Sequence, residues 1–178
     1  LTAISVLSLL PSEQVIRSCL ANLVVEGRFQ QLSTEPLVFT DVAHNPESAR
    51  YLANKLSSYK DKGFKIHALA AMLADKDKAG VLKEVSHLVD EWSLASLSGP
   101  RGDTASNLQN ALQELSHHNT INSYDSVAQA LNVILPEQQS DTMLIVFGSI
   151  SLIADAISLS PPKITILVKI NLLIFYFI

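Results

Sequence analysis

The sequence predicts an α/β domain with a mostly parallel sheet and helices on both of its faces. Largely apolar runs mark three strands, at 37–40, 65–73 and 142–149, because a strand buried on both faces needs such a run. The segments between them carry apolar residues at helical spacing. Strands that alternate with helices are typical of right-handed βαβ units, which build parallel sheets.

The first expected elements are a helix over residues 12–24 and two short strands between residues 26 and 41. Ser12 is a suitable N-cap for this helix. The apolar residues of the helix recur at helical spacing: Val15, Ile16, Cys19, Leu20 and Leu23. Turn residues separate the two strands, and the second strand is the apolar run 37–40.

A helix over residues 46–59 follows a polar segment, "DVAHNP". Asn45 is a good N-cap. Pro46 fits the first helical position, because a backbone N–H at this position would have no partner within the helix and proline lacks one. One face of the helix is apolar: Ala49, Leu52, Ala53 and Leu56. The segment therefore has one clear structural role, which is to start this helix.

The remaining expected elements are strands at 65–73, 93–97 and 142–149 and helices at 77–92, 104–115, 123–134 and from residue 150 onward. Apolar residues at helical spacing up to Trp92 define the helix over 77–92. Asp103 and Thr104 are both suitable N-caps for the helix that follows them.

Composition excludes several classes of protein. The chain has 178 residues, 48% of them hydrophobic, which is enough for about one domain with a packed core. The net charge of −4 and the lack of a basic stripe argue against a nucleic-acid partner. The only cysteine, Cys19, makes no internal disulfide, so the cytoplasm is the expected compartment. The apolar run after residue 160 is shorter than a spanning helix, so no membrane anchor is expected.

Four polar clusters follow predicted strands: 41–45, 75–77, 98–104 and 148–149. The carboxyl ends of parallel strands share one edge of a sheet, and ligands of open α/β sheets bind outside that edge. A nucleotide-binding half-site is one interpretation of these clusters. The other is a charged rim of the kind any such domain carries, in which Asp41 and Asn45 only cap a helix.

Motifs for other chemistries are missing from the sequence. G-x-x-x-x-G-K-[ST] and G-x-G-x-x-G do not occur, so no phosphate-cradling loop is expected. No Cys/His spacing predicts a metal site, and "VFGSIS" lacks the second glycine of a serine-nucleophile turn. His67 lies within a predicted strand and is expected to be structural, His87 lies on a helix, and His117 and His118 end one.

Six segments occur in an order that is specific to one family: "GRFQ", "DVAHNPESARYL", "AMLADKD", "SGPRG", "YDSVAQAL" and "VFGS". Over roughly residues 12–157 the chain resembles the C-terminal part of bacterial bifunctional dihydrofolate synthase/folylpolyglutamate synthases, which are Mur ligase relatives. "DxAHNP" alone would leave other Mur-type amide ligases open. The resemblance implies a Rossmann-like fold, the Mur ligase C-terminal domain, which closes over a nucleotide.

The resemblance also implies an activity and its site residues. Enzymes of this family use ATP and Mg²⁺ to add L-glutamate to dihydropteroate or folates through an acyl phosphate. Arg28 and Asp41 match the ATP contacts, His44 matches a catalytic position, and Ser149 matches the region of the glutamate site. The phosphate loop and the Mg²⁺ ligands belong to the N-terminal domain, so no metal ligand is expected in this chain.

Three regions are expected on this basis. Residues 1–26 would be a remnant of the N-terminal ATP-binding domain, 27–160 the Mur ligase C-terminal (glutamate ligase) domain, and 161–178 an atypical apolar tail. The chain would then be inactive without its own N-terminal domain, which is its expected partner. The alternatives are a non-catalytic remnant or binding module of the same fold, or the C-terminal domain of another Mur-type ligase.

Overall fold

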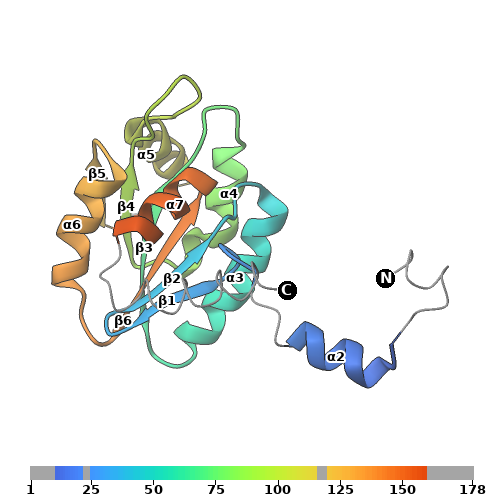
Figure 1. Ribbon diagram of the computed structural model, residues 1–178. Helices are drawn as coiled ribbons and strands as arrows, with labels where there is room; N and C mark the ends of the chain where they lie inside the picture. Colours follow the sequence, from blue (N-terminus) through green and yellow to red (C-terminus); the bar gives the residue numbers. More distant parts are fainter. Residues whose placement is uncertain (1–10, 22–24, 116–119, 160–178) are drawn as a thin grey trace.

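A six-stranded sheet forms the centre of the computed structural model, which describes residues 11–21, 25–115 and 120–159 (Figure 1). The strands are β1 (Gln30–Thr34), β2 (Leu37–Asp41), β3 (Lys65–Ala71), β4 (Glu91–Ala95), β5 (Thr120–Tyr124) and β6 (Thr142–Gly148). Their order across the sheet is β1-β2-β6-β3-β4-β5. β1 is antiparallel to β2, and the other neighbouring strands are parallel. The prediction of a mostly parallel sheet is confirmed.

Helices cover both faces of the sheet, as predicted. They are α3 (Pro46–Lys60), α4 (Lys78–Val85), α5 (Ala105–Glu114), α6 (Val127–Glu137) and α7 (Ile150–Leu159). The apolar residues of α3, α4 and α5 pack with Trp92 and Phe147 on one face. Those of α6 and α7 pack with Leu69 and Val146 on the other. The result is a three-layer domain with two apolar cores (Figure 1).

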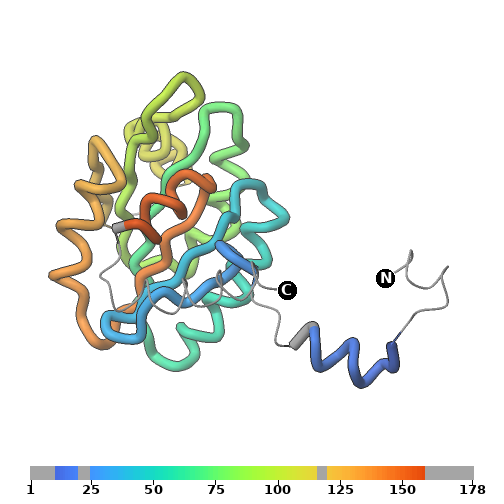
Figure 2. Tube along the Cα trace, viewed as in Figure 1, coloured from blue at the N-terminus to red at the C-terminus, as the bar shows by residue number. Residues whose placement is uncertain are grey.

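The first described helix, α2 (Glu13–Ala21), lies apart from the sheet (Figure 2). Ser12 accepts a bond from the backbone N–H of Val15 at 3.4 Å, in agreement with its predicted capping role. The predicted apolar face is not buried, because Val15 is 48% exposed and Ile16 only half-buried. Residues 22–24 of the predicted helix, His117, His118 and the predicted tail 161–178 lie outside the described residues.

Helix α3 begins as the sequence predicts. The side chain of Asn45 accepts a bond from the Ser48 backbone N–H at 2.9 Å, and Ser48 Oγ in turn accepts one from the Asn45 N–H at 3.3 Å. This reciprocal pair is a capping box, and Pro46 occupies the first turn. All four residues of the predicted apolar face are buried: Ala49, Leu52, Ala53 and Leu56.

Asn45→Ala is expected to lower the free energy of unfolding by about 0.5–2 kcal/mol, because the first turn of α3 loses its side-chain acceptor. Urea denaturation of the full chain measures the loss. Ser58→Ala is the matched control, since Ser58 is exposed on the same helix away from the cap. Its effect should stay within about 0.5 kcal/mol. Equal losses in both variants would contradict a capping role for Asn45.

The predicted helix over 77–92 is wrong beyond residue 85. Helix α4 ends at Val85, a 3₁₀ turn spans Ser86–Leu88, and β4 starts at Glu91. Trp92 is fully buried within β4, where it pairs with Ala68 and Ile121 on the neighbouring strands. Trp92 stands at helical spacing to the apolar residues of α4, but it is buried as part of a strand. Apolar spacing alone does not distinguish the two environments.

The sequence did not predict β5, and the helix expected over 123–134 starts too early. Residues 120–124 read "TINSY" and form an edge strand that is only partly buried, so they carry only a weak apolar signal, from Ile121 and Tyr124. They are held by parallel pairing with β4. Helix α6 begins at Val127 after Ser126, whose hydroxyl accepts from the Gln129 N–H at 3.2 Å.

The chain order places a switch point between β3 and β6. These strands are neighbours, but α4 leaves β3 toward one face and α7 leaves β6 toward the other. Ligands of open α/β sheets bind outside the carboxyl ends of strands at such a point. A ligand site is therefore expected at this point.

Candidate functional site

The strand ends at the switch point bring two of the predicted clusters together. Asp41 at the end of β2 pairs in register with Phe147 of β6, and Gly148 pairs with Ala71 of β3. The backbone N–H of Ser149 donates to the Ala71 carbonyl at 2.9 Å. Asp41 and Ser149 thus lie at the same edge of the sheet, as the sequence predicted.

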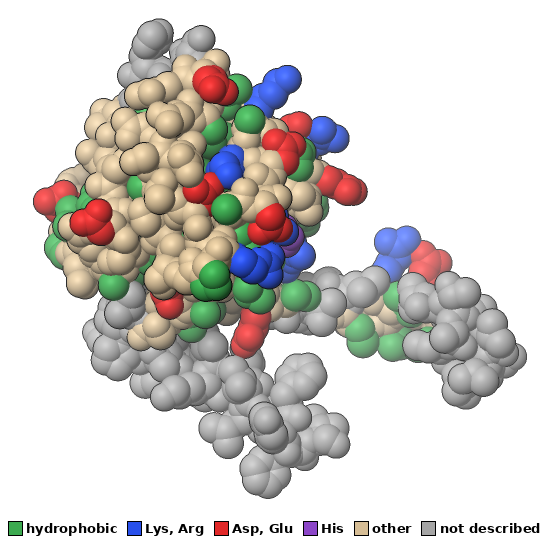
Figure 3. Space-filling model, turned by 90° about the horizontal axis from the view of Figure 1, so that it is seen from above, with side chains coloured by type: hydrophobic (Ala, Val, Ile, Leu, Met, Phe, Trp, Pro, Cys, Tyr) green, Lys and Arg blue, Asp and Glu red, His purple; other side chains and the backbone are tan. Residues whose placement is uncertain are grey.

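The other two clusters, 75–77 and 98–104, are joined to each other. Arg101 donates to Asp75 at 3.3 Å, and the Arg101 carbonyl accepts from the Ala74 N–H at 3.0 Å. Lys78 and Asp103 form an ion pair at 2.5 Å, in which Asp103 is 4% exposed. Burial alone would raise the pKa of Asp103, but bonds from Lys78, Asn107 and Thr104 together lower it. Figure 3 shows acidic and basic side chains interspersed on this end of the molecule.

The "GRFQ" segment forms a turn against the end of β2. Gly27 adopts φ +65°, and its carbonyl accepts from the Val42 N–H at 2.7 Å. The Phe29 N–H donates to Asp41 Oδ2 at 2.8 Å. Because Phe29 also has a positive φ, +43°, this bond holds a backbone conformation that most residues avoid. The sequence did not reveal this contact, which joins residues twelve positions apart.

Asp41 is buried, whereas Arg28 is exposed. Only 3% of Asp41 is accessible, and this burial raises the pKa of its carboxyl group. The N–H groups of Phe29 and Ala43 and the charge of Arg28 oppose that rise. Asp41 therefore anchors the turn from inside, and the turn presents the Arg28 guanidinium to solvent.

His44 is half-buried directly after this anchor, and its Nδ1 lies 2.7 Å from the carbonyl oxygen of Val42. A carbonyl only accepts, so Nδ1 carries the proton of this bond. A neutral His44 ring then has its lone pair on Nε2. The backbone of Val42 links the turn to His44, because its N–H donates to Gly27 and its carbonyl bonds His44. Asp41 holds the same turn through Phe29, so Arg28, Asp41 and His44 form one hydrogen-bonded structure.

Ser149 reaches the same edge through β6 instead. It is 5% exposed, and its Oγ lies 2.9 Å from Ser151 Oγ at the start of α7. Gly27 links the two parts of the site, because a Cβ on it would lie 3.0 Å from Val42 and 3.5 Å from Ile153 of α7. The turn, the end of β2 and α7 are therefore packed together.

The sequence profile of the Mur ligase, glutamate ligase domain family matches residues 27–150. The chain belongs to this family. Its matched segment runs from the "GRFQ" turn to the start of α7, so all the candidate site residues of this Mur ligase domain lie within it.

Relatives of the Mur ligase domain are bifunctional folate enzymes. It is 39% identical over 143 residues to the dihydrofolate synthase/folylpolyglutamate synthase of Escherichia coli K12, covering 80% of this chain and 32% of that protein. It superimposes on E. coli FolC in complex with ADP with a TM-score of 0.76 at 37% identity. The corresponding enzyme of Yersinia pestis, complexed with AMPPNP and Mn, gives 0.74 at 38% identity. Each structural match covers 88% of this chain and 37% of the other.

The Mur ligase domain thus spans about a third of the length of the relatives it matches. Among the described residues, no three His, Cys, Asp or Glu side chains are grouped so that they could hold a metal ion. In the same part of the chain, no helix is both long and apolar enough to cross a membrane.

His67 of the Mur ligase domain lies away from this site, within β3. It is 7% exposed, and its Nε2 lies 2.9 Å from Ser93 Oγ. Burial lowers the pKa of His67 below its usual value, although Glu91 and Gln138 oppose the shift. His87, predicted to lie on a helix, lies in the 3₁₀ turn that follows α4.

His67 is expected to make the folded state sensitive to acid. The unfolded chain binds a proton at the ordinary pKa, near 6.5, while the folded chain binds it only at a lower pH. The free energy of unfolding should therefore fall as pH drops below about 6.5, by at most about 1.4 kcal/mol per pH unit for this group. Urea denaturation between pH 5 and 7.5 should show a smaller slope for His67→Gln than for the unmodified chain. Identical slopes would contradict the assignment.

Proposed function

We propose that this chain is the C-terminal domain of an ATP-dependent ligase that adds L-glutamate to dihydropteroate or folates. The placement of Arg28 carries the proposal: an exposed guanidinium on a turn that a buried carboxylate anchors, beside the switch point of a Mur ligase domain. The relatives that bind ADP and AMPPNP support a nucleotide as the ligand.

Arg28 and Asp41 are the proposed ATP contacts. The guanidinium offers parallel N–H donors that match two phosphate oxygens, which suits it to a polyphosphate. Asp41 keeps the turn in place through the Phe29 N–H and sets the position of Arg28. When bound, ATP supplies the phosphoryl group that activates the carboxylate of the pteroate or folate.

His44 and Ser149 are the proposed contacts of the reacting amine and the incoming glutamate. With Nδ1 bonded to Val42, the Nε2 atom of a neutral His44 can accept a proton from the amine that attacks. The hydroxyl of Ser149 can donate to a glutamate carboxylate while the Ser149 oxygen accepts a bond from the hydroxyl of Ser151. L-Glutamate and dihydropteroate or folate are thus the proposed substrates.

The N-terminal domain of such an enzyme is the proposed partner and the source of the Mg²⁺ ligands. The Mn ion in the Yersinia pestis relative supports a divalent metal for the reaction. Closure of the two domains would bring Arg28 and His44 close to the phosphate loop of the N-terminal domain. The cytoplasm is the proposed compartment, because the free thiol of Cys19 is exposed and suits a reducing environment.

Two other functions stay open beside this one. Another Mur-type amide ligase would share the fold and the "DVAHNP" segment but act on a different acceptor. A non-catalytic binding module would keep the fold without turnover. The 39% identity to a bifunctional folate enzyme favours the folate ligase over both.

The purified chain alone is expected neither to hydrolyse ATP nor to ligate glutamate. Its sequence has no G-x-x-x-x-G-K-[ST] segment to hold the phosphates. A chimera that carries this domain in place of the matching part of the E. coli relative should ligate glutamate, as measured by glutamate-dependent ADP release. Turnover by the isolated chain would contradict the proposed dependence on a partner domain. A folded chimera that binds ATP but ligates nothing would favour the binding module.

A further inference from the structure

The backbone N–H groups of the "GRFQ" turn are bonded within the domain. The Gly27 N–H donates to Gln30 Oε1 at 2.9 Å, and the Arg28 N–H donates to the Val25 carbonyl at 3.0 Å. The next N–H along the chain is the one that Asp41 accepts. In loops that cradle a phosphate, successive N–H groups face the ligand instead. The guanidinium of Arg28 is therefore the group with which this turn can bind a phosphate, and its position depends on the turn.

Phe29 carries the backbone strain of the turn. Among the described residues it is the only non-glycine residue with a positive φ, +43°. Glycine would adopt this conformation readily, whereas a Cβ atom makes it unfavourable. Strain of this kind persists where the surrounding structure enforces it, and it is concentrated at functional sites. The side chain of Phe29 therefore contributes something that glycine would not.

The half-buried ring of Phe29 packs into a cluster of aromatic rings. It stacks on Phe39 of β2, with ring centroids 4.6 Å apart and an angle of 25° between the planes. The ring centroid of Tyr59, near the end of α3, lies 6.0 Å from that of Phe29 and 5.3 Å from that of Phe39. Stacked and tilted arrangements are the favoured geometries of aromatic pairs. Phe29 is thus held twice, by Asp41 at its backbone and by the cluster at its side chain.

We propose that Phe29 is a positioning residue of the nucleotide site. Its ring fixes the turn in the strained conformation, so that the guanidinium of the neighbouring Arg28 meets the phosphates without rearrangement. A group that is already in place loses less freedom on binding, which raises affinity. The inference rests on the proposed function, because it takes ATP as the ligand of Arg28. It adds a residue that acts through Arg28 and need not touch the nucleotide.

Steady-state kinetics of the active chimera test the proposal. Phe29→Leu removes the ring and should raise KM for ATP about threefold to tenfold, while KM for glutamate stays unchanged. Phe29→Tyr keeps the ring and should hold KM for ATP within about twofold of the unmodified value. In an Arg28→Ala background, Phe29→Leu should have no further effect on KM for ATP, because the group that the ring positions is gone.

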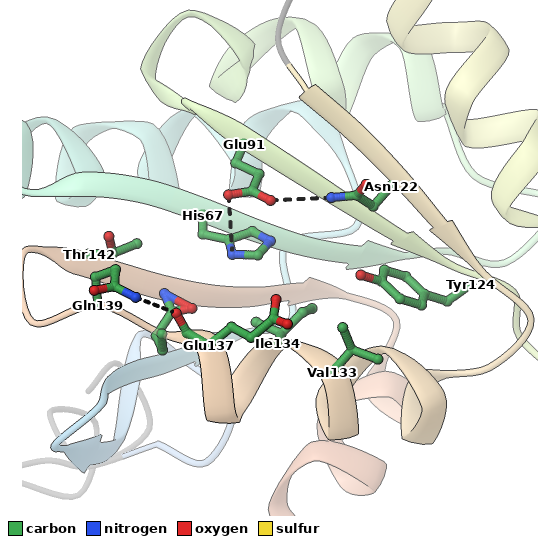
Figure 4. A pocket seen from close by; sticks show the side chains of 10 residues that line it. His67, Glu91, Asn122, Tyr124, Val133, Ile134, Glu137, Gln139 and Thr142 are labelled. Carbon is green, nitrogen blue, oxygen red and sulfur yellow. Dashed lines mark hydrogen bonds and ion pairs between the residues drawn. The ribbon is translucent and has the colours of Figure 1, made fainter.

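Tyr124→Leu is the matched control, because it also removes a half-buried aromatic ring. Tyr124 ends β5, which lies at the other end of the strand order from β1, and Figure 4 shows it among the residues that line a polar cavity. This variant should leave KM for ATP unchanged, with or without Arg28, whatever its effect on the melting temperature.

Hydrogen exchange of the full ¹⁵N-labelled chain supplies a test that needs no activity. In Phe29→Leu the amides of residues 27 and 29 should exchange at least about tenfold faster than in the unmodified chain, relative to the amides of β6. Equal protection of these amides would overturn the inference, because the ring would not hold the turn. An unchanged KM for ATP in Phe29→Leu, or an equal rise with and without Arg28, would overturn it as well. If Arg28→Ala itself leaves KM for ATP unchanged, the proposed function is contradicted and the inference fails with it.

Discussion

Gly148→Ala is expected to lower the free energy of unfolding by about 3 kcal/mol or more. Gly148 has φ +130°, which L residues rarely adopt and which costs about 1–3 kcal/mol. A Cβ at this position would also lie 2.2 Å from the carbonyl oxygen of Ala71, so β6 and β3 would have to separate. Such crowding costs a further 1–3 kcal/mol, roughly. The two costs act at the switch point, where little space is available for either strand to move.

Gly63→Ala is the matched control for this prediction. Gly63 has φ +87°, but a Cβ there would meet nothing within 4 Å. Its substitution should cost only the conformational part, about 1–2 kcal/mol. Urea denaturation of both variants measures the difference. If the two losses are equal, the close approach of β6 to β3 does not constrain residue 148. A destabilised Gly148→Ala chain should also misplace Ser149, whose N–H donates to the same carbonyl.

The fold could be predicted from the sequence where residues close together in the chain determine the local structure by themselves. Asn45 and Pro46 define the start of α3 by capping chemistry, which needs no partner from elsewhere in the chain. The sequence predicts Trp92 on a helix, but a buried residue of a strand is apolar as well, and Trp92 lies in β4. Residues 120–124 are mostly polar, with Ile121 and Tyr124 packed against the cores, and they form a strand by pairing with β4. Non-local pairing is the information that local patterns lack.

The candidate site could likewise be predicted only in part. The positions of Asp41 and Ser149 followed from strand ends in a parallel sheet, and the structure brings them to one edge. The bond between Asp41 and the Phe29 N–H did not follow, because it depends on how the "GRFQ" turn folds back on β2. That bond changes the expectation for Asp41. A carboxylate that is 3% exposed and accepts from the Phe29 N–H contributes to stability, whereas the sequence left two roles open for Asp41, a ligand contact and a helix cap.

Asp41→Ala and Asp41→Asn are therefore expected to differ in stability. Alanine leaves the Phe29 N–H without its acceptor, which costs about 1–3 kcal/mol. Asparagine keeps an oxygen acceptor and removes a charge that burial disfavours, as the raised pKa of Asp41 indicates. Asp41→Asn should thus unfold within about 1 kcal/mol of the unmodified chain.

Arg28→Ala should lower kcat/KM for ATP about ten- to a hundredfold in the active chimera. The loss of a charge-assisted contact is worth about 1.5–3 kcal/mol, which converts to that range. Stability should be unaffected, because the side chain of Arg28 is exposed. Arg28→Lys should recover only part of the activity, since an ammonium group cannot offer two parallel donors. Asp41→Asn should also lower kcat/KM for ATP, by a smaller factor, because the turn keeps its acceptor but the negative charge that attracts the Arg28 guanidinium is lost. Lys62→Ala, on an exposed turn far from the switch point, is the control for charge removal. Steady-state kinetics and melting temperatures are measured on the same preparations. If Arg28→Ala and Asp41→Asn keep full kcat/KM but unfold early, the "GRFQ" turn is scaffold and does not bind the nucleotide.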